Sequence, residues 1–448
     1  VVMPGVRAAS FLVLPVAVLL AGCSLGQRIN SVVNEAVGAP ATTAGLAVGD
    51  EPYSVKTGTA ILSEGGSAAD AVTAMFFAMT ATYPVAAGLG GGGICLVADP
   101  VKGVREFDFL PRAASAGGTV AVPGAARGFY DLQAQFGMLP WQRDVAGGEA
   151  FAGTGFPISH DLAIRLAKLA ARLRQDPTLA AEFLDANGRP KPEGTIISNP
   201  NLSQTLAIIR LGGAAAFYGG AVADEMIRAA NANGGRLSLA DFSAYRTHTG
   251  SPQMIAEGDL RVALPSRQTG AGAFAEVLFA HLAPSADPES AVMAAVRQSL
   301  AAYGIASLPA DLGATGFAAI DKNGQAAACG VTLNGAFGAG VSAEGVLLAK
   351  APAMPSGIAG AFLFPVIVRN SSGNVVLAGA GAGGPNGTGA IAYALLKLAA
   401  GQAVDRASEL RSTGAAPAVT ANLISCAGGL CVALPDPGGH GLGAGQGQ

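Results

Sequence analysis

The chain has 448 residues, of which 50% are hydrophobic and 13% are charged. Typical soluble proteins carry about 25% charged residues, so this composition predicts a large core under a thinly charged surface and disfavours a disordered chain. With 27 basic and 30 acidic residues, the chain has no positive excess to attract a polyanion, and a nucleic-acid partner is not expected.

The first residues have the pattern of an export signal. Arg7 precedes an apolar run over residues 8–20, which is too short to span a bilayer and is typical of a secretory signal core. The run ends in Leu20-Ala21-Gly22-Cys23, which resembles the bacterial lipobox, whose cysteine is lipidated. The alternative is an ordinary signal cleaved at a small residue. We therefore expect a signal peptide over residues 1–22, a lipid anchor on Cys23 that holds the chain to a membrane, and a flexible tether over residues 23–46.

Such an anchor places the protein in the bacterial cell envelope, facing the periplasm, and Ser24 after the cysteine favours the outer membrane. Disulfides can form in that oxidising compartment. Cys426 and Cys431 flank a short turn between two apolar runs, so we expect them to pair across a hairpin. Cys95 and Cys329 lie in apolar, strand-like segments and are interpreted as buried small hydrophobic residues. The four histidines are scattered without ligand spacing, so neither a metal site nor a cofactor is expected.

The ordered region is expected to begin near residue 47 with a buried helix and a glycine-rich strand entry. Ser67 and Asp70 form a capping box, which predicts a helix from there to about Thr82, apolar on most sides. The run of glycines over residues 88–93 then feeds a strand over residues 94–97. A phosphate-binding loop is the alternative, but no Lys-Ser or Lys-Thr follows, and the run leads into a strand rather than out of one.

Helices come first along the chain and hairpins later. Helical patterns cover about 160–174, 201–211 and 219–232. Strands over 317–320 and 326–333 flank a strong turn signal, and a second hairpin joins 362–368 to 375–378 before a last helix that ends near residue 400. This order predicts an α+β fold with antiparallel sheets covered by helices.

Several motifs occur in the order found in one enzyme family. They are Gly65-Gly66-Ser67-Ala68-Ala69-Asp70-Ala71, the glycine run at 88–93, Val122-Pro123-Gly124, the strand that follows Gly313, Thr332-Leu333-Asn334 and Phe337-Gly338-Ala339-Gly340. Together they resemble the γ-glutamyltranspeptidase family. The resemblance implies a four-layer αββα sandwich, with two stacked antiparallel sheets between helical layers, as in N-terminal-nucleophile hydrolases. We expect this domain over residues 47–435 and a glycine-rich, disordered tail over residues 436–448.

The position of the nucleophile departs from the family. A threonine there becomes a new N-terminus by self-cleavage and then attacks the substrate, and the resemblance places that threonine at Ala314. Alanine has no hydroxyl and can neither start the cleavage nor attack an amide. Thr315 is the alternative catalytic residue, although the alternation of side chains along a strand points it to the other face.

The predicted substrate pocket has lost most of its polar groups. The family's arginine, which grips the substrate carboxylate, falls on Leu110, and Arg112 two residues later is the alternative anchor. By resemblance, Thr332 and Asn334 are retained in the substrate pocket, and Gly383 and Gly384 stand where the family's oxyanion glycines lie. Each of them is also an ordinary strand, turn or loop residue. Further family side chains map to residues without the same chemistry: Gly316, Ala318, Ala351, about Met354, Ala361 and Phe362.

Two hypotheses follow. In the first, the chain is a γ-glutamyltransferase-like lipoprotein that does not cleave itself and is catalytically inactive, retained as a binding or structural module. In the alternative, it is an active hydrolase or transferase that acts on glutathione-like γ-glutamyl amides through Thr315. In both, the expected partner is a γ-glutamyl or peptide-like small molecule. The fold alone does not decide between them.

Overall fold

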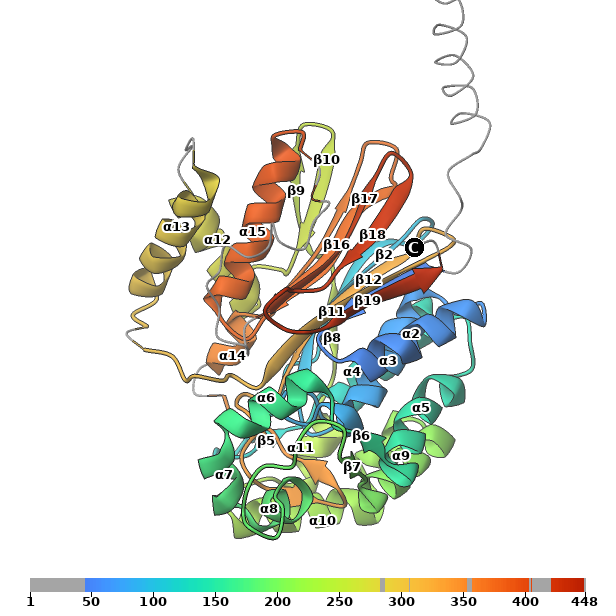
Figure 1. Ribbon diagram of the computed structural model, residues 1–448, viewed down its shortest axis with the longest axis vertical. Helices are drawn as coiled ribbons and strands as arrows, with labels where there is room; N and C mark the ends of the chain where they lie inside the picture. The colour runs from blue at the N-terminus through green and yellow to red at the C-terminus, as the bar shows by residue number, and fades with distance from the viewer. Residues whose placement is uncertain are drawn as a thin grey trace, which may run out of the picture. The chain divides into compact units, whose positions relative to one another are not determined.

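Two antiparallel sheets are stacked at the centre of the computed structural model (Figure 1). The first has seven strands in the order β19 (Leu442–Gln446), β1 (Gly45–Gly49), β11 (Ala314–Asp321), β12 (Ala326–Thr332), β2 (Gly92–Asp99), β3 (Gly103–Asp108) and β8 (His248–Gly250). The second has six, in the order β18 (Leu430–Leu434), β17 (Thr420–Ala427), β16 (Val375–Ala382), β15 (Phe364–Arg369), β10 (Leu260–Leu264) and β9 (Gln253–Glu257). The structure describes residues 45–282, 287–305, 307–352, 357–402, 404 and 420–446.

Strand β11 shows how alternating side chains build the layers. Phe317 and Ala319 are buried in the large core on the side of helices α2 (Pro52–Ser63) and α3 (Ala68–Thr82). Ala318 and Ile320 point the other way, into the core between the two sheets, where Ala378 of the second sheet meets them. Because side chains alternate along a strand, one apolar strand supplies both cores.

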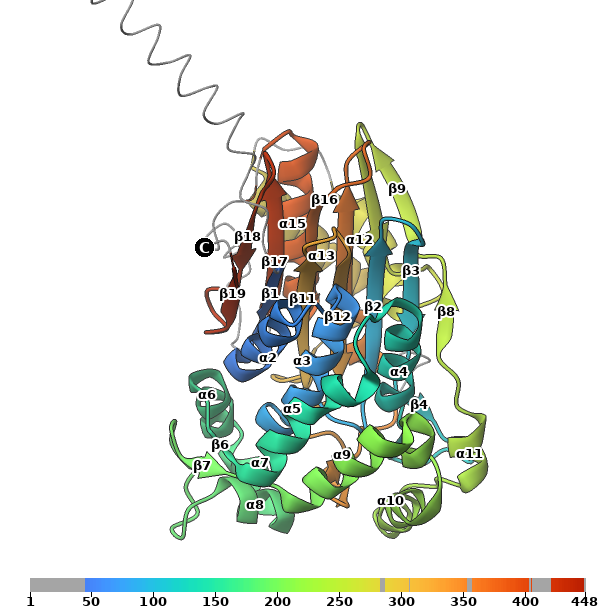
Figure 2. The same ribbon diagram turned by 90° about the vertical axis from the view of Figure 1, so that its right-hand side faces the viewer.

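Helices cover both outer faces. Figure 2 shows α2 and α3 lying along the strands of the first sheet, in agreement with their contacts with β1, β11 and β12. Helices α12 (Gly270–His281), α13 (Pro288–Ala302) and α15 (Pro385–Ala399) lie on the side of the second sheet, which α12 and α15 contact directly while α13 packs against those two helices. The predicted αββα arrangement is therefore confirmed.

The remaining elements lie in the connections between these layers. The helices are α4 (Ala125–Phe136), α5 (Trp141–Thr154), α6 (His160–Lys168), α7 (Ala170–Gln175), α8 (Pro177–Phe183), α9 (Pro200–Gly212), α10 (Gly220–Ala232), α11 (Leu239–Ala244) and α14 (Gly357–Ala361), with a 3-10 turn over Ala214–Phe217. Two-stranded ribbons pair β4 (Arg112–Ala113) with β5 (Ala121–Val122), β6 (Phe156–Pro157) with β7 (Ile196–Ile197), and β13 (Ser342–Ala343) with β14 (Val346–Leu347).

Helix α3 forms where the sequence predicts it. Ser67 accepts a hydrogen bond from the backbone N–H of Asp70 (3.1 Å), and Asp70 accepts one from the backbone N–H of Ser67 (2.8 Å). All its residues are buried, because α2, α5 and the first sheet surround it. A mostly apolar helix is stable only in such a position.

The predicted domain boundaries need correction at both ends. Strand β1 begins at Gly45, inside the predicted tether, and pairs with β11. The tail is not disordered over residues 442–446, because β19 pairs there with β1 and extends the first sheet. Glycine and alanine in β19 permit this close pairing. The high glycine content of the tail had instead predicted disorder. The signal peptide, Cys23 and residues 23–44 lie outside the described residues. None of the described helices is long and apolar enough to cross a membrane.

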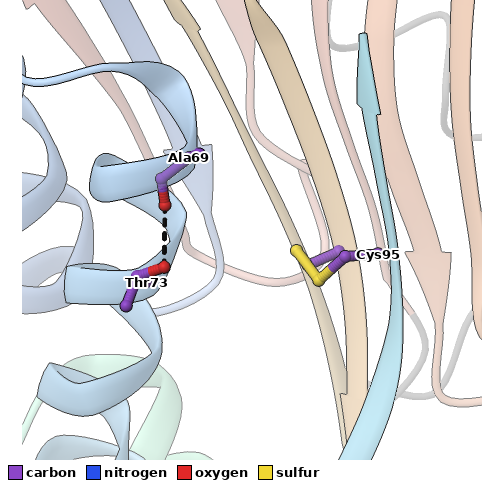
Figure 3. Close-up of a disulfide and its surroundings, with 4 residues drawn as sticks. Ala69, Thr73 and Cys95 are labelled. Atoms are coloured by element: carbon purple, nitrogen blue, oxygen red, sulfur yellow. Dashed lines mark hydrogen bonds between the residues drawn. A yellow bond between two sulfur atoms is a disulfide. The ribbon is translucent and has the colours of Figure 1, made fainter. Parts of the chain in front are cut away.

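Two disulfides join opposite strands. Cys426 and Cys431 are bonded across the β17–β18 hairpin, where the sequence predicts a pair. Cys95 and Cys329 are also bonded, which corrects their interpretation as separate apolar residues. They lie directly opposite each other on β2 and β12, on the face turned toward α3, where Figure 3 shows Ala69 and Thr73. The two strands are far apart in sequence, so nothing local indicated that the cysteines would meet.

Candidate functional site

A tight turn delivers Ala314 to the first position of β11. Gly313 has φ +58°, and a Cβ atom there would stand 2.0 Å from the carbonyl oxygen of Gly335. Only glycine fits, because both the left-handed backbone and the contact exclude a side chain. The turn thus fixes Ala314 opposite Thr332 on β12.

Thr332 and Asn334 hold this turn together. The Thr332 hydroxyl donates to the carbonyl oxygen of Gly313 (3.0 Å) and accepts from the backbone N–H of Asn334 (2.8 Å). The Asn334 amide donates to the carbonyl oxygen of Lys350 (2.9 Å). The structure therefore brings both residues to Ala314, with these polar groups bonded to the backbone.

The methyl group of Ala314 lies in an apolar cluster. We call the following residues the Ala314 cluster: Ile94, Leu110, Ala271, Ala314, Leu363 and Ala382. Each is at most 4% exposed. Leu110, at the position of the family's arginine, packs inside this cluster. None of these hydrophobic members offers a nucleophile or a base, and the hydroxyl of Thr332, opposite Ala314 on β12, bonds the Gly313 carbonyl.

Gly383 and Gly384 form the turn that follows the cluster member Ala382. Gly383 has φ +81°, and Gly384 is the N-cap of α15 without a side-chain cap. Backbone N–H groups at a helix N-terminus suit an anion. Their position beside the Ala314 cluster agrees with the predicted oxyanion turn, and that role stays a prediction.

Arg112 is engaged outside the Ala314 cluster. Its guanidinium lies 4.9 Å from the centre of the Tyr245 ring, and Nη1 donates to the carbonyl oxygen of Arg246 (3.0 Å). Its Nη2 is 3.8 Å from Oδ2 of Asp108, the nearest carboxylate. These contacts hold Arg112 against the segment after α11, while Leu110 occupies the cluster.

The other mapped positions are occupied by backbone and apolar contacts. The N–H of Ala351 donates to the carbonyl oxygen of Thr119 (2.9 Å). Ala361 and Phe362 are buried against Phe274. Met354 lies outside the described residues.

Thr315 belongs to a buried polar network on the opposite face of β11. Its hydroxyl donates to Oδ2 of Asp50 (2.6 Å), which also accepts from the Thr420 hydroxyl (2.8 Å). The Asn422 amide donates to Oδ1 of Asp50 (2.7 Å), and Asn422 in turn accepts from the N–H of Asp436 (3.0 Å). We call these five residues the Asp50 network. Burial raises the pKa of Asp50, while the hydrogen bonds from Asn422, Thr315 and Thr420 act in the opposite direction.

A second set of buried charges adjoins this network. The Arg165 guanidinium, with a side chain 2% exposed, bonds both carboxylate oxygens of Asp311 (3.0 and 2.5 Å) and donates to the Tyr83 hydroxyl (2.9 Å). Tyr83 donates to Asp161, whose pKa burial raises to about 7. The positive charge of Arg165 also opposes the rise in the pKa of Asp50. Thr315 is thus surrounded by bonded polar groups and is itself 0% exposed.

The residues at the start of β11 lie away from four pockets of the described part of the chain. Ala314, Thr315 and Thr332 line none of the four pockets of 320–610 Å³ found in the described part of the chain. In that same part, no group of three or more His, Cys, Asp or Glu side chains is arranged to hold a metal ion.

The sequence did not indicate the partners of Thr315. Asp50 and Glu51 precede Pro52, a pattern that predicts only the start of a helix, and Glu51 is indeed the N-cap of α2. Asp50 reaches Thr315, Thr420 and Asn422 across hundreds of residues of chain. The contact between Asp50 and Thr315 could be predicted only by knowing that β1 pairs with β11.

Comparisons with known proteins agree on one family. The family model for gamma-glutamyltranspeptidase matches residues 54–281, a region that ends before Ala314. Glutathione hydrolase 7 of Mus musculus is 32% identical over 246 residues, which cover 50% of this chain and 36% of that protein. The acylase ACY 1 proenzyme of Pseudomonas sp. is 31% identical over 241 residues, which cover 48% of this chain and 43% of that protein. The match therefore spans less than half the length of either relative.

Solved structures show the same fold over more of the chain. Cephalosporin acylase from Bacillus halodurans superposes with a TM-score of 0.72 and 17% identity, covering 90% of this chain and 96% of that one. The gamma-glutamyltranspeptidase of Helicobacter pylori gives a TM-score of 0.52 and 22% identity, covering 58% of this chain and 84% of that one. At these identities the likeness concerns the fold.

Proposed function

The chain belongs to the gamma-glutamyltranspeptidase family, and from that premise we propose that it is a member that neither cleaves itself nor transfers γ-glutamyl groups. The Ala314 cluster carries the proposal. A methyl group stands where the family's motif has a hydroxyl, and the hydrophobic residues packed around it are buried. The chain is then retained as a binding or structural module of the cell envelope.

The missing hydroxyl removes two steps at once. In this family's self-cleavage, the hydroxyl attacks the preceding carbonyl, here that of Gly313. The C–N bond breaks, which frees the α-amine and leaves an ester, and water then hydrolyses the ester to give back the hydroxyl and a new C-terminal carboxylate. An alanine methyl cannot make that bond at any pH, so neither the nucleophile nor its amine base arises. In this structure the Gly313 carbonyl oxygen accepts a hydrogen bond from the Thr332 hydroxyl.

Loss of the carboxylate anchor supports the same proposal. Leu110 is 4% exposed inside the Ala314 cluster, and Arg112 is held against Tyr245. A substrate carboxylate would meet apolar side chains at that position. Loss of a hydrogen bond to a charged group typically costs about 1.5–3 kcal/mol of binding free energy.

Activity through Thr315 is the competing hypothesis. Its hydroxyl does bond a carboxylate, Asp50 (2.6 Å), as an activated hydroxyl would. However, Thr315 is 0% exposed and lines none of these four pockets, so its hydroxyl is covered by protein in this structure. The alternative therefore lacks a supporting observation beyond the hydrogen bond.

Export and lipid anchoring at Cys23 complete the proposal. Two disulfides within the described residues fit an oxidising compartment such as the periplasm. Cells fed a fatty-acid analogue should label the wild-type protein and should not label Cys23→Ser. Equal labelling of the two would refute the anchor without touching the argument about Ala314.

The test of inactivity uses the mature chain purified from the cell envelope. Intact mass and N-terminal sequencing should show a chain uncut at residue 314, and neither glutathione nor γ-glutamyl-p-nitroanilide should be hydrolysed. A new N-terminus at Ala314 or Thr315, together with hydrolysis that Thr315→Ala abolishes, would overturn the proposal in favour of Thr315.

A further inference from the structure

A polar pocket lies at the edge where both sheets end. It has a volume of about 490 Å³, and its lining comes from β3, β8, the link from β8 to β9, the first residue of β9 and the loop that precedes α12. That volume is in the range of small-molecule sites. The pocket shares no lining residue with the Ala314 cluster.

Two carboxylates form one wall of this edge pocket. Glu106 and Asp108 stand two residues apart on β3, so both point to the same face, while Phe107 between them is buried in the core on the helical side. Glu106 is only 3% exposed. A nearly buried carboxylate that lines a pocket needs hydrogen-bond donors.

The protein supplies Glu106 with donors from a single residue. The backbone N–H of Ser266 donates to Oε2 (2.5 Å) and the Ser266 hydroxyl to Oε1 (3.1 Å). These bonds fix the loop before α12 to β3, so the pocket is preformed. Each carboxylate oxygen can accept a further bond.

Gln253 provides a second, independent sign of a missing donor. Its Oε1 atom is buried and has no hydrogen-bond partner among the described residues, and Gln253 lines the same pocket. A buried amide oxygen without a donor lowers the stability of the folded protein. A ligand that brings N–H groups would remove that cost.

The cations near the pocket do not fill this need. Arg267 and His248 have side chains 64% and 68% exposed, so they lie at the rim, and Arg267 is paired with Glu276 (3.3 Å). His248 and Arg112 approach Asp108 only to 3.7 and 3.8 Å. No ion pair or hydrogen bond from a cationic side chain to Glu106 occurs in the described part of the chain.

We propose that the edge pocket binds the primary ammonium group of a small molecule or of a peptide N-terminus, with Glu106 and Gln253 as its acceptors. An ammonium group offers three N–H donors and a positive charge, which match one buried carboxylate and one unpaired amide oxygen. Ammonium binding at this pocket is independent of catalytic activity at β11, because the pocket contains none of the residues of the Ala314 cluster.

Binding should depend on pH with a definite sign. Burial raises the pKa of Glu106 to about 7, and Asp108 nearby acts in the same direction. The other groups that face the pocket are His248 and Arg267. Since the cation prefers the ionised carboxylate, affinity should fall about tenfold from pH 8 to pH 6 as Glu106 takes up its proton.

The test titrates the purified full-length protein with n-butylamine hydrochloride at pH 8, followed by calorimetry or ligand-observed NMR. n-Butanol, which has the same shape without the charge, should bind at least about tenfold more weakly, and n-butyrate should not bind. Trialanine amide distinguishes a peptide N-terminus from a free amine as the source of the ammonium group. Equal affinity for n-butylamine and n-butanol would overturn the proposal.

Two variants and one control locate the site. Glu106→Gln should weaken n-butylamine about tenfold, whereas Glu257→Gln, an exposed carboxylate on neighbouring β9, should leave the affinity unchanged. Gln253→Leu should weaken binding and at the same time raise the melting temperature of the free protein. A purely structural role of Gln253 predicts no loss of binding. Wild-type affinity in both Glu106→Gln and Gln253→Leu would refute the site, and a thermal melt shows that each variant is folded.

Discussion

The two faces of β11 at its first residues differ completely. Ala314 points between the sheets into the Ala314 cluster, whereas Thr315 points the other way into the Asp50 network. On the Ala314 face the packed side chains are apolar except for Thr332, whose hydroxyl bonds the Gly313 carbonyl. On the other, every member of the network is hydrogen-bonded. Burial is tolerated in both cases, because a buried position must be either apolar or satisfied.

This difference shows two ways in which the residues at the start of β11 are accommodated in the interior. On the face to which the family's motif assigns its nucleophile, buried apolar residues pack together. On the other face, polar residues and the carboxyl of Asp50 are buried, and their hydrogen bonds join the segment after β1 to β11 and β17. A polar residue next to the expected nucleophile is therefore no evidence of catalysis.

The strongest way to break the comparison is to place the family's charge in the apolar face. Leu110→Arg would bury a guanidinium without a partner in the Ala314 cluster, and we expect a loss of about 3–5 kcal/mol in the free energy of unfolding. Urea unfolding measures it. Leu211→Arg, at a position 72% exposed on α9, is the matched control and should change stability by less than about 0.5 kcal/mol. A fully stable Leu110→Arg protein would show that the cluster has a hidden anionic partner.

The second prediction removes the carboxyl group at the centre of the Asp50 network. Asp50→Ala would leave the hydroxyls of Thr315 and Thr420 and the amide of Asn422 without their acceptor, at a cost of about 3 kcal/mol. Thr315→Val removes a single donor and should cost about 1 kcal/mol. If the two variants were equally stable, the network would not be a unit.

Ala314→Thr tests whether the apolar face still tolerates its expected nucleophile. A hydroxyl in the dry cluster should destabilise the protein by about 1–3 kcal/mol, and self-cleavage should stay absent or slow, because Leu110 and the cluster remain. Mass spectrometry after prolonged incubation detects the cut. Rapid and complete cleavage would mean that one substitution alone had silenced the enzyme.

The buried carboxyl groups should also make the free energy of unfolding depend on pH, whereas the Ala314 cluster should not. Burial raises the pKa of Asp161 to about 7 and that of Asp436 to about 6, both above the ordinary value for aspartate. The folded state then binds more protons than the unfolded state, so this contribution to stability is complete below about pH 4 and is lost as the pH rises through 6–7. Asp161→Asn should flatten the pH dependence of urea unfolding by more than about 1 kcal/mol over this interval. If the pH dependence of urea unfolding were the same in Asp161→Asn as in the wild type, the titrating group would be a residue other than Asp161. The Ala314 cluster contains no titratable side chain, so it cannot be the source.

Local signals predicted the elements, and non-local contacts escaped prediction. The capping box of Ser67 and Asp70 gave α3, and the turn between Cys426 and Cys431 indicated their pairing, because in each case the partners are a few residues apart. Strand β19, the bond between Cys95 and Cys329 and the partners of Asp50 depend on which strands become neighbours. Motif order alone supplied the αββα arrangement, and composition suggested a disordered tail where a strand forms.

The disulfide between Cys95 and Cys329 has a practical consequence for any cut before Ala314. The two cysteines are 234 residues apart, with one on each side of that peptide bond. Fragments produced there would stay covalently tethered and migrate together on a denaturing gel until a reducing agent is added. A single band without reductant is consequently no proof of an intact chain, and the same tether would keep a nicked protein assembled through purification.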